Sequence, residues 1–103
     1  MVTKIQYKRY NGWRGVRPDV SGWATWNVAA WLNNDEGLYH AYRDFVRNHK
    51  GRLSGSDAED FVRELLPNGT PAMKKYGGPK CYRQVHWPSI AAMFREARDK
   101  LVS

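Results

Sequence analysis

The sequence predicts a mainly α-helical fold: a small single-domain bundle of about four helices with an irregular N-terminal arm. Apolar residues repeat at helical spacing in four separate stretches, and capping residues, glycine and proline stand at the ends of these stretches. The chain of 103 residues is long enough for one hydrophobic core and too short for two. We therefore expect a basic arm at 1–20 packed on a helical domain at 21–103.

The first two predicted helices lie in residues 21–46, which hold three of the five tryptophans. Ser21 is the predicted N-cap of a helix that runs to about Asn33. Its apolar stripe consists of Ala24, Val28, Trp31 and Leu32, flanked by Trp23, Trp26 and Ala30. We therefore expect this helix to be largely buried. On this interpretation, Trp31→Ala destabilises the fold by about 3–5 kcal/mol because it leaves a large cavity.

The second predicted helix begins at a polar turn, where Asn34 or Asp35 can act as N-cap, and ends before Gly51. Its buried face consists of Leu38, Tyr42, Phe45 and Val46. The third helix is predicted from a capping box at Ser56-Asp57-Ala58-Glu59 and ends near Pro67. Its buried face consists of Ala58, Phe61, Val62, Leu65 and Leu66.

Residues 67–87 are predicted to be irregular, with a helix of one or two turns after Thr70-Pro71. Pro88 opens the last helix, and Trp87 before it is expected to be mostly buried against the first helix pair. One face of this helix consists of Ile90, Phe94, Ala97 and Leu101, while Arg95, Arg98 and Lys100 are expected to face water. The predicted core contains Trp26, Val28, Trp31, Leu32, Tyr42, Phe45, Phe61, Leu65, Ile90 and Phe94.

The N-terminal arm alternates weakly over residues 3–10, which allows a short strand. Glycine and proline then break the arm, and Trp13 is expected to anchor it on the first helix. No apolar run approaches the roughly 18 residues that a membrane span needs, and the N-terminus lacks the apolar core of a signal peptide. The expected location is the cytoplasm, with no membrane partner.

The formal net charge of +7 is concentrated in the arm and in residues 74–83. Both segments interleave cations with aromatic residues, a composition that binds phosphates by charge and bases by stacking. The predicted contacts to an anionic partner are Arg9, Arg14, Arg17, Lys74, Lys75, Tyr76, Lys80, Tyr82 and Arg83. We expect their segments to converge or to lie on neighbouring loops. The alternative is that the charge serves solubility while the aromatic residues pack in the core.

Catalytic or metal-binding patterns are weak. His40 and Asp44 stand four residues apart, a spacing that suits a base with its carboxylate but is more typical of a surface contact. Cys81 is the only cysteine, so no internal disulfide can form, and a site built from Cys81, His86 and His49 lacks metal-ligand spacing. Cys81 itself has two interpretations: a thiol with a lowered pKa, or a small buried hydrophobe. The second is favoured. No catalytic residue, metal or cofactor is predicted.

A polar set in the first helix pair consists of Asn27, Asn33, Asn34 and Asp35. Its two interpretations are a binding site and helix capping, and capping is favoured because it already accounts for Asn34 or Asp35.

A sequence motif spans residues 22–39 in the order Gly-Trp-x-Thr-Trp-Asn-Val-x-x-Trp-Leu-x-Asn-Asp-x-Gly-Leu-Tyr, and Val85-His86-Trp87-x-x-Ile90-Ala91 follows downstream. These segments resemble a family of small bacteriophage and mobile-element proteins with the patterns N-Y-E-T-W-N-V-x-L-W-L-x-N-D-x-G and V-D-W-x-E-I-A. Two departures are Ala24 and His86, which stand where the family has acidic residues. The resemblance implies a phage-type accessory protein that binds host machinery.

Three functions from different classes are compatible with the sequence. The favoured one is a non-enzymatic accessory protein that binds nucleic acid, or a host complex that handles nucleic acid, and can thereby inhibit host defence. The first alternative is a protein that sequesters an anionic nucleotide in a pocket of tryptophan and arginine side chains. The second is a small enzyme, which lacks a convincing nucleophile or paired carboxylates. Either a monomer or a homodimer is compatible with this chain length.

Overall fold

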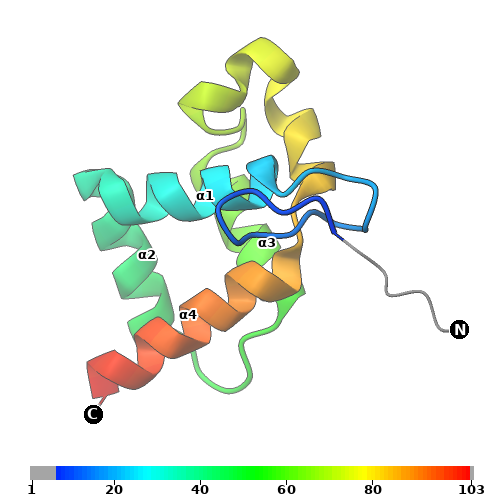
Figure 1. The fold of residues 1–103 in the computed structure, drawn as a ribbon. Coiled ribbons are helices and arrows are strands. Elements are labelled where there is room, and N and C mark those ends of the chain that lie inside the picture. Colours follow the sequence, from blue (N-terminus) through cyan, green and yellow to red (C-terminus); the bar gives the residue numbers. More distant parts are fainter. Residues whose placement is uncertain (1–6, 103) are drawn as a thin grey trace, which may run out of the picture.

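The structure, a computed structural model, describes residues 7–102 and, for their side chains, residues 7–101 (Figure 1). The elements are α1 (Trp23–Asn34), α2 (Glu36–Asn48), α3 (Gly55–Leu65), the 3-10 helices η1 (Pro71–Tyr76) and η2 (Gly78–Gln84), and α4 (Trp87–Val102). This part of the chain contains no strand, only two isolated bridges. The predicted mainly α-helical single domain is confirmed.

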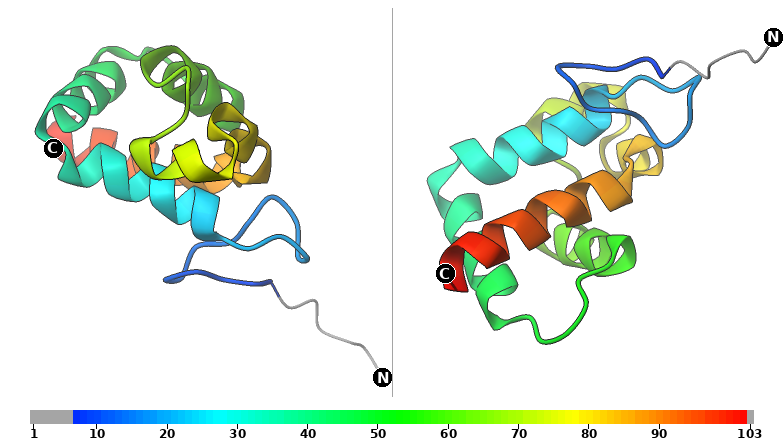
Figure 2. Two further views of the ribbon diagram at one scale, coloured as in Figure 1. Left: turned by 90° about the horizontal axis from the view of Figure 1, so that it is seen from above. Right: turned by 60° about the horizontal axis from the view of Figure 1, so that its bottom comes forward.

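Helix α4 packs against α1, α2 and α3, so it lies at the centre of the bundle. Figure 2 shows α1 and α4 running side by side, with α2 joining them at one end and the arm beyond the start of α1. The two 3-10 helices pack on each other, and η2 also packs on α1. They form the irregular region predicted at 67–87. None of the helices in the described chain is long and apolar enough to cross a membrane.

The core lies between the inner faces of α1, α2, α3 and α4. Half of the predicted core is fully buried, namely Val28, Leu32, Tyr42, Ile90 and Phe94. The other half is only partly buried, so the prediction overstated the burial of these residues: Trp26, Trp31, Phe45, Phe61 and Leu65. Phe45 and Phe61 stack with ring centroids 4.3 Å apart at the edge of the core, beside the buried Phe94.

The predicted inward stripe of α1 is confirmed at Ala24, Val28 and Leu32, but Trp31 is only partly buried, like the flanking Trp26. The three buried residues recur at four-residue spacing. The small side chain of Ala24 allows α4 and η2 to approach the helix closely. Trp26 contacts Tyr10 of the arm with a centroid distance of 5.0 Å, and Trp31 lines a surface hollow with it.

Helix starts were predicted to within a few residues. Asp35 caps α2 by accepting a hydrogen bond from the Leu38 amide at 3.0 Å, as expected. The capping box of α3, however, is formed by Ser54 and Asp57 and not by Ser56. Ser54 lies three residues before Asp57, which is the spacing that lets side chain and backbone bond reciprocally. Its position places the start of α3 at Gly55.

The cations of α4 were expected to face water, but two of them bind the loop between α2 and α3. Arg95 Nη1 donates to the Leu53 carbonyl at 2.8 Å, and Arg98 Nη1 donates to the Gly51 carbonyl at 2.7 Å. Leu53 itself is fully buried, so this loop is held on both sides. Loop carbonyls that no helix satisfies are natural acceptors for arginine.

The arm is held to the domain by backbone hydrogen bonds. The Gly22 amide donates to the Lys8 carbonyl at 2.8 Å, and the Val16 amide donates to the Gln84 carbonyl at 2.9 Å. A Cβ on Gly22 would overlap the Trp13 carbonyl, so glycine is required where the arm meets α1. Trp13, which was expected to anchor the arm on the first helix, is partly buried and packs against the core. The expected strand at 3–10 lies largely outside the described residues; within 7–10 only an isolated bridge at Tyr10 is formed.

Trp87 is 9% exposed, which confirms its predicted burial, but its ring contact, at a centroid distance of 5.8 Å, is with Tyr82 of η2 and not with the first helix pair. It therefore anchors the start of α4 beneath η2.

Candidate functional site

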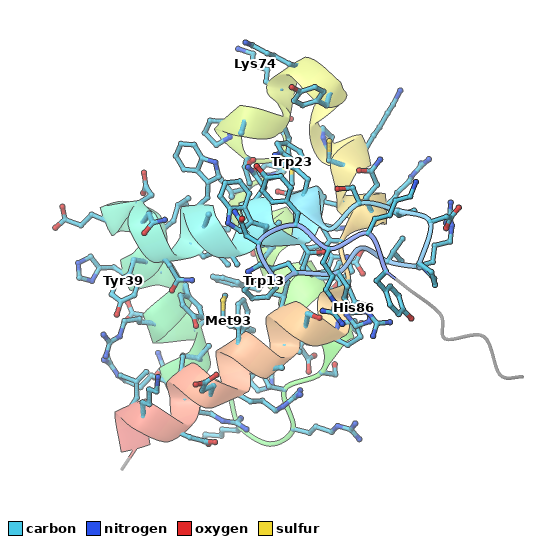
Figure 3. The ribbon with its side chains drawn as sticks, viewed as in Figure 1. Trp13, Trp23, Tyr39, Lys74, His86 and Met93 are labelled. Atoms are coloured by element: carbon cyan, nitrogen blue, oxygen red, sulfur yellow. The ribbon has the colours of Figure 1, made fainter. Side chains whose placement is uncertain are left out.

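The two 3-10 helices carry four exposed cations and an exposed tyrosine. We name this region, with the adjoining Trp23 of α1, the η surface; its residues are Trp23, Lys74, Lys75, Tyr76, Lys80 and Arg83. Figure 3 shows Lys74 at the tip of the molecule and Trp23 between this tip and α1. Gly77 joins the two helices with φ of 105°, a left-handed conformation that glycine adopts readily. Met73 of η1 and Cys81 and Tyr82 of η2 are buried and fix the two short helices, while their cations are exposed.

The cations of the η surface have no acidic neighbours. The sequence contains no Asp or Glu between Glu64 and Glu96. Within the described chain, Lys74, Lys75, Lys80 and Arg83 form no ion pair. Some cations elsewhere in the described chain are paired, as in Arg63 with Glu59 at 2.7 Å. The positive charge of the η surface is therefore available to an external anion.

An aromatic pair lies among these cations. Tyr76 is 68% exposed, and its ring meets the Trp23 ring edge-on with a centroid distance of 5.3 Å. A hollow of about 330 Å³ lies beside the pair, lined by Trp23, Tyr76, Cys81 and Gln84. An exposed ring of this size in a cationic surface is suited to stacking on a planar ligand.

Tyr82 does not belong to this surface, contrary to the sequence prediction. It is fully buried, its hydroxyl donates to the Leu66 carbonyl at 2.6 Å, and burial raises its pKa to about 12. In a 3-10 helix residues three apart share a face, so Tyr82 lies on the inner face while Lys80 and Arg83 point to solvent. Trp23 takes its place, which sequence reasoning missed because it treated Trp23 as a flank of the core.

The three arginines of the arm do not all join the η surface. Arg17 pairs with Asp19 at 2.8 Å on the exposed arm. Arg9 and Arg14 line a separate hollow of about 530 Å³ between the arm and α4. The arm contacts the end of η2 through the Val16–Gln84 hydrogen bond. The charges of the two segments nevertheless serve two different hollows.

The weak catalytic and metal candidates do not assemble. Asp44 lies 3.4 Å from Arg47, and no bond joins it to the exposed His40. Across residues 7–101 no three His, Cys, Asp or Glu side chains gather as a metal site. Cys81 is buried and desolvation raises its pKa, which confirms a small buried hydrophobe and overturns the lowered pKa.

The polar set of α1 has structural roles. Asp35 caps α2, and Asn33 Nδ2 donates to the Ala29 carbonyl at 2.8 Å. Asn27 is buried and accepts a hydrogen bond from the Thr70 hydroxyl, while Asn34 is exposed. The hydroxyl of Thr70 is therefore engaged in a buried hydrogen bond.

Comparison with known proteins bears on the resemblance. Residues 6–97 match a family of unknown function, DUF7249. The chain belongs to this family. Neither a curated protein nor a solved structure matches the DUF7249 chain. The match covers α1, α2, α3, η1, η2 and most of α4, so the family encompasses both the η surface and the hollow of the arm.

Proposed function

We propose that this DUF7249 protein binds single-stranded nucleic acid through the η surface. The observation that carries the proposal is the exposed Tyr76 ring, held edge-on by the partly buried Trp23, among cations that have no acidic partner in the described chain. Cations that track a phosphate backbone, together with a ring on which bases stack, are the elements of sequence-tolerant single-strand binding.

A single strand suits this surface better than a duplex. The η surface contains no regular helix that can enter a major groove, because η1 and η2 are short 3-10 helices. The ring of Tyr76 is accessible only to a base that is already unstacked. Duplex binding through Lys74, Lys75 and Lys80 alone is non-specific and weaker.

We further propose the setting that the resemblance implies: a phage-type accessory protein of the host cytoplasm that acts on nucleic acid or on a host complex that handles it, and thereby inhibits host defence. The net charge of +7 supports an anionic partner of either kind. A nucleic-acid partner is favoured over an acidic protein because of the exposed stacking pair.

The test is a titration of labelled single-stranded oligonucleotides at several salt concentrations. Each phosphate neutralised contributes a slope of about −0.7 to the logarithm of the binding constant against that of salt, because counterions are released. Replacing Lys74 and Lys75 together with alanine should flatten this slope. Replacing Lys50 and Arg52 together with alanine is the matched control, since it removes the same charge from an exposed loop away from η1 and η2.

Stacking is tested separately. Tyr76→Ala should weaken single-strand binding by about 1–3 kcal/mol, whereas Tyr76→Trp keeps a stacking ring and should retain it. Tyr76 is largely exposed, so both variants should melt close to the parent temperature. No measurable binding near physiological salt would refute the proposal and leave docking on an acidic protein as the surviving function.

A further inference from the structure

The hollow between the arm and α4 carries a second inference, which is independent of the η surface. We name it the arm hollow; its volume is about 530 Å³, and the residues that matter here are Arg9, Trp13, Arg14, Asn33, Ser89 and Glu96. Figure 3 shows Trp13 and Met93 in the space between α1 and α4, with His86 to one side. No residue of the η surface lines it.

One end of the arm hollow is cationic. Arg9 and Arg14 form no ion pair among the described residues. The Arg14 guanidinium lies 3.9 Å from the centroid of the Tyr7 ring, and its Nη2 donates to the Tyr7 hydroxyl at 2.6 Å. These contacts hold the guanidinium in one orientation, so it need not be ordered when a ligand binds.

Arg14 also has an unsatisfied donor. Its Nε is buried and has no hydrogen-bond partner in residues 7–101. A buried N–H without an acceptor is costly, and on a charged group more so. An oxyanion entering the hollow beside Arg14 supplies a counter-charge to the guanidinium.

The start of α4 adds to the positive potential. Ser89, in the first turn of α4, lines the hollow, and its Oγ lies 2.6 Å from His86 Nδ1. Burial, followed by the charge of Arg14, lowers the pKa of His86, so the positive charge at this end of the hollow comes from the arginines. The Ser89 hydroxyl and the positive end of the helix dipole both favour negative charge here.

The remainder of the hollow is not suited to a bare anion. Trp13 contributes a partly buried ring, and the hollow is also lined by Asn33 of α1 and by Glu96 of α4, whose Oε1 lies 3.6 Å from Lys100 Nζ. Glu96 repels an anion but accepts hydrogen bonds from a donor. A hollow of this size, cationic at one end and with a ring and acceptors beyond it, matches a ligand that joins a phosphate to a planar base.

We propose that the arm hollow binds a mononucleotide, with the phosphate between Arg9 and Arg14 and the base against Trp13. Glu96 then faces the base edge and favours a base with an exocyclic amine, because a carboxylate accepts from such a donor as it does from cytosine N4. Uracil offers an acceptor at the same position and is disfavoured.

Calorimetric titration of the whole chain with cytidine 5′-monophosphate tests the proposal, with uridine 5′-monophosphate, cytidine and inorganic phosphate as comparison ligands. The cytidine nucleotide should bind more tightly than all three. Arg14→Gln and Arg9→Ala should each weaken it by roughly tenfold, the loss expected for a charge-assisted hydrogen bond. Glu96→Gln should reduce the preference for cytidine over uridine nucleotide.

Controls separate this site from the η surface. The Lys74 and Lys75 double alanine variant should bind the nucleotide like the parent, and Arg9→Ala should bind oligonucleotides like the parent. Arg9 lies on the exposed arm, so its variant keeps the test valid if Arg14→Gln impairs folding.

Three results would overturn the mononucleotide site: no heat with any probe at millimolar concentration, equal affinity for inorganic phosphate, or unchanged binding by the Arg9 variant. If Arg9→Ala lost oligonucleotide binding while the protein bound no mononucleotide, the mononucleotide site would be overturned. The proposed function would then stand, with the oligonucleotide bound along both the η surface and the arm hollow.

Discussion

The hydroxyl of Thr70 donates a hydrogen bond to Oδ1 of Asn27, and both residues are buried. The bond joins Asn27 of α1 to the residue that precedes η1. The two residues are 43 positions apart in the chain. Because η1 carries Tyr76 and α1 carries Trp23, this contact helps to fix the two rings of the η surface relative to each other. A polar pair in the core thus supports the candidate site from beneath.

Thr70→Val should destabilise the fold by about 1–3 kcal/mol, because it leaves the Asn27 carbonyl oxygen buried without a donor. Urea unfolding measures the loss. Thr70→Ser keeps the hydroxyl and is the control. The double variant Asn27→Leu, Thr70→Val should cost less than the sum of its single changes, since it removes both polar groups. Strict additivity would show that the bond contributes nothing specific.

The position of the tryptophans of α1 reverses an expectation about stability. Trp31 is only partly buried, so Trp31→Ala should cost about 1–2 kcal/mol at roughly 25 cal/mol per Å² of apolar area, and not the 3–5 kcal/mol expected for a core residue. Phe94 is fully buried against Tyr42, Phe45 and Phe61, and Phe94→Ala should cost about 3–5 kcal/mol. Chemical denaturation of both variants decides; equal losses would place Trp31 in the core.

Local signals in the sequence were sufficient for the helices. Asp35, Pro71 and Trp87 stand at or beside element starts because capping and proline geometry act over a few residues. The inward stripe of α1 was predicted as well, since Ala24, Val28 and Leu32 are all buried. The partial exposure of Trp31 was not, because an apolar residue beside this stripe fits the helical pattern whether or not another element covers it.

Most residues of the candidate site were predicted from the sequence, but which of them lie together was not. Lys74, Lys75 and Lys80 are exposed as expected, since a segment without acids has no partner for them. The burial of Tyr82 depends on the turn of η2, and the separation of Arg14 from the η surface depends on the path of the arm. Both are tertiary features that residue spacing does not encode.

The capping box of α3 provides a matched pair of serines. Ser54→Ala should destabilise the protein by about 1 kcal/mol, because it removes the acceptor that the Asp57 amide bonds at 3.1 Å. Ser56 is exposed within the first turn, and Ser56→Ala should change stability by less than about 0.5 kcal/mol. Thermal or urea unfolding separates the two. A larger loss of stability in Ser56→Ala than in Ser54→Ala would instead support the helix start that was expected from the sequence.

His86 predicts a pH dependence of stability. Burial, then the nearby charge of Arg14, lowers its pKa in the folded state below the usual value of about 6.5. Unfolding therefore takes up a proton between the two pKa values, so stability is complete above about pH 6.5 and declines as pH falls through this window. His86→Gln should show a smaller decline between pH 8 and pH 5 than the parent. His40→Gln, at an exposed position of α2, is the control and should decline like the parent.

The reaction rate of the Cys81 thiol reports on the packing of η2 beneath the η surface. The Cys81 side chain is 3% exposed, it lines the hollow beside Tyr76, and burial raises the pKa of its thiol. The thiolate is the reactive form, so reaction with a disulfide reagent requires local opening of η2. An opening free energy of about 3 kcal/mol makes the native thiol roughly a hundredfold slower than the thiol of the urea-unfolded chain. A saturating single-stranded oligonucleotide bound over Tyr76 should slow the reaction further, whereas it should leave the unfolded rate unchanged. Native and unfolded rates that agree within a few-fold would show that Cys81 is not enclosed.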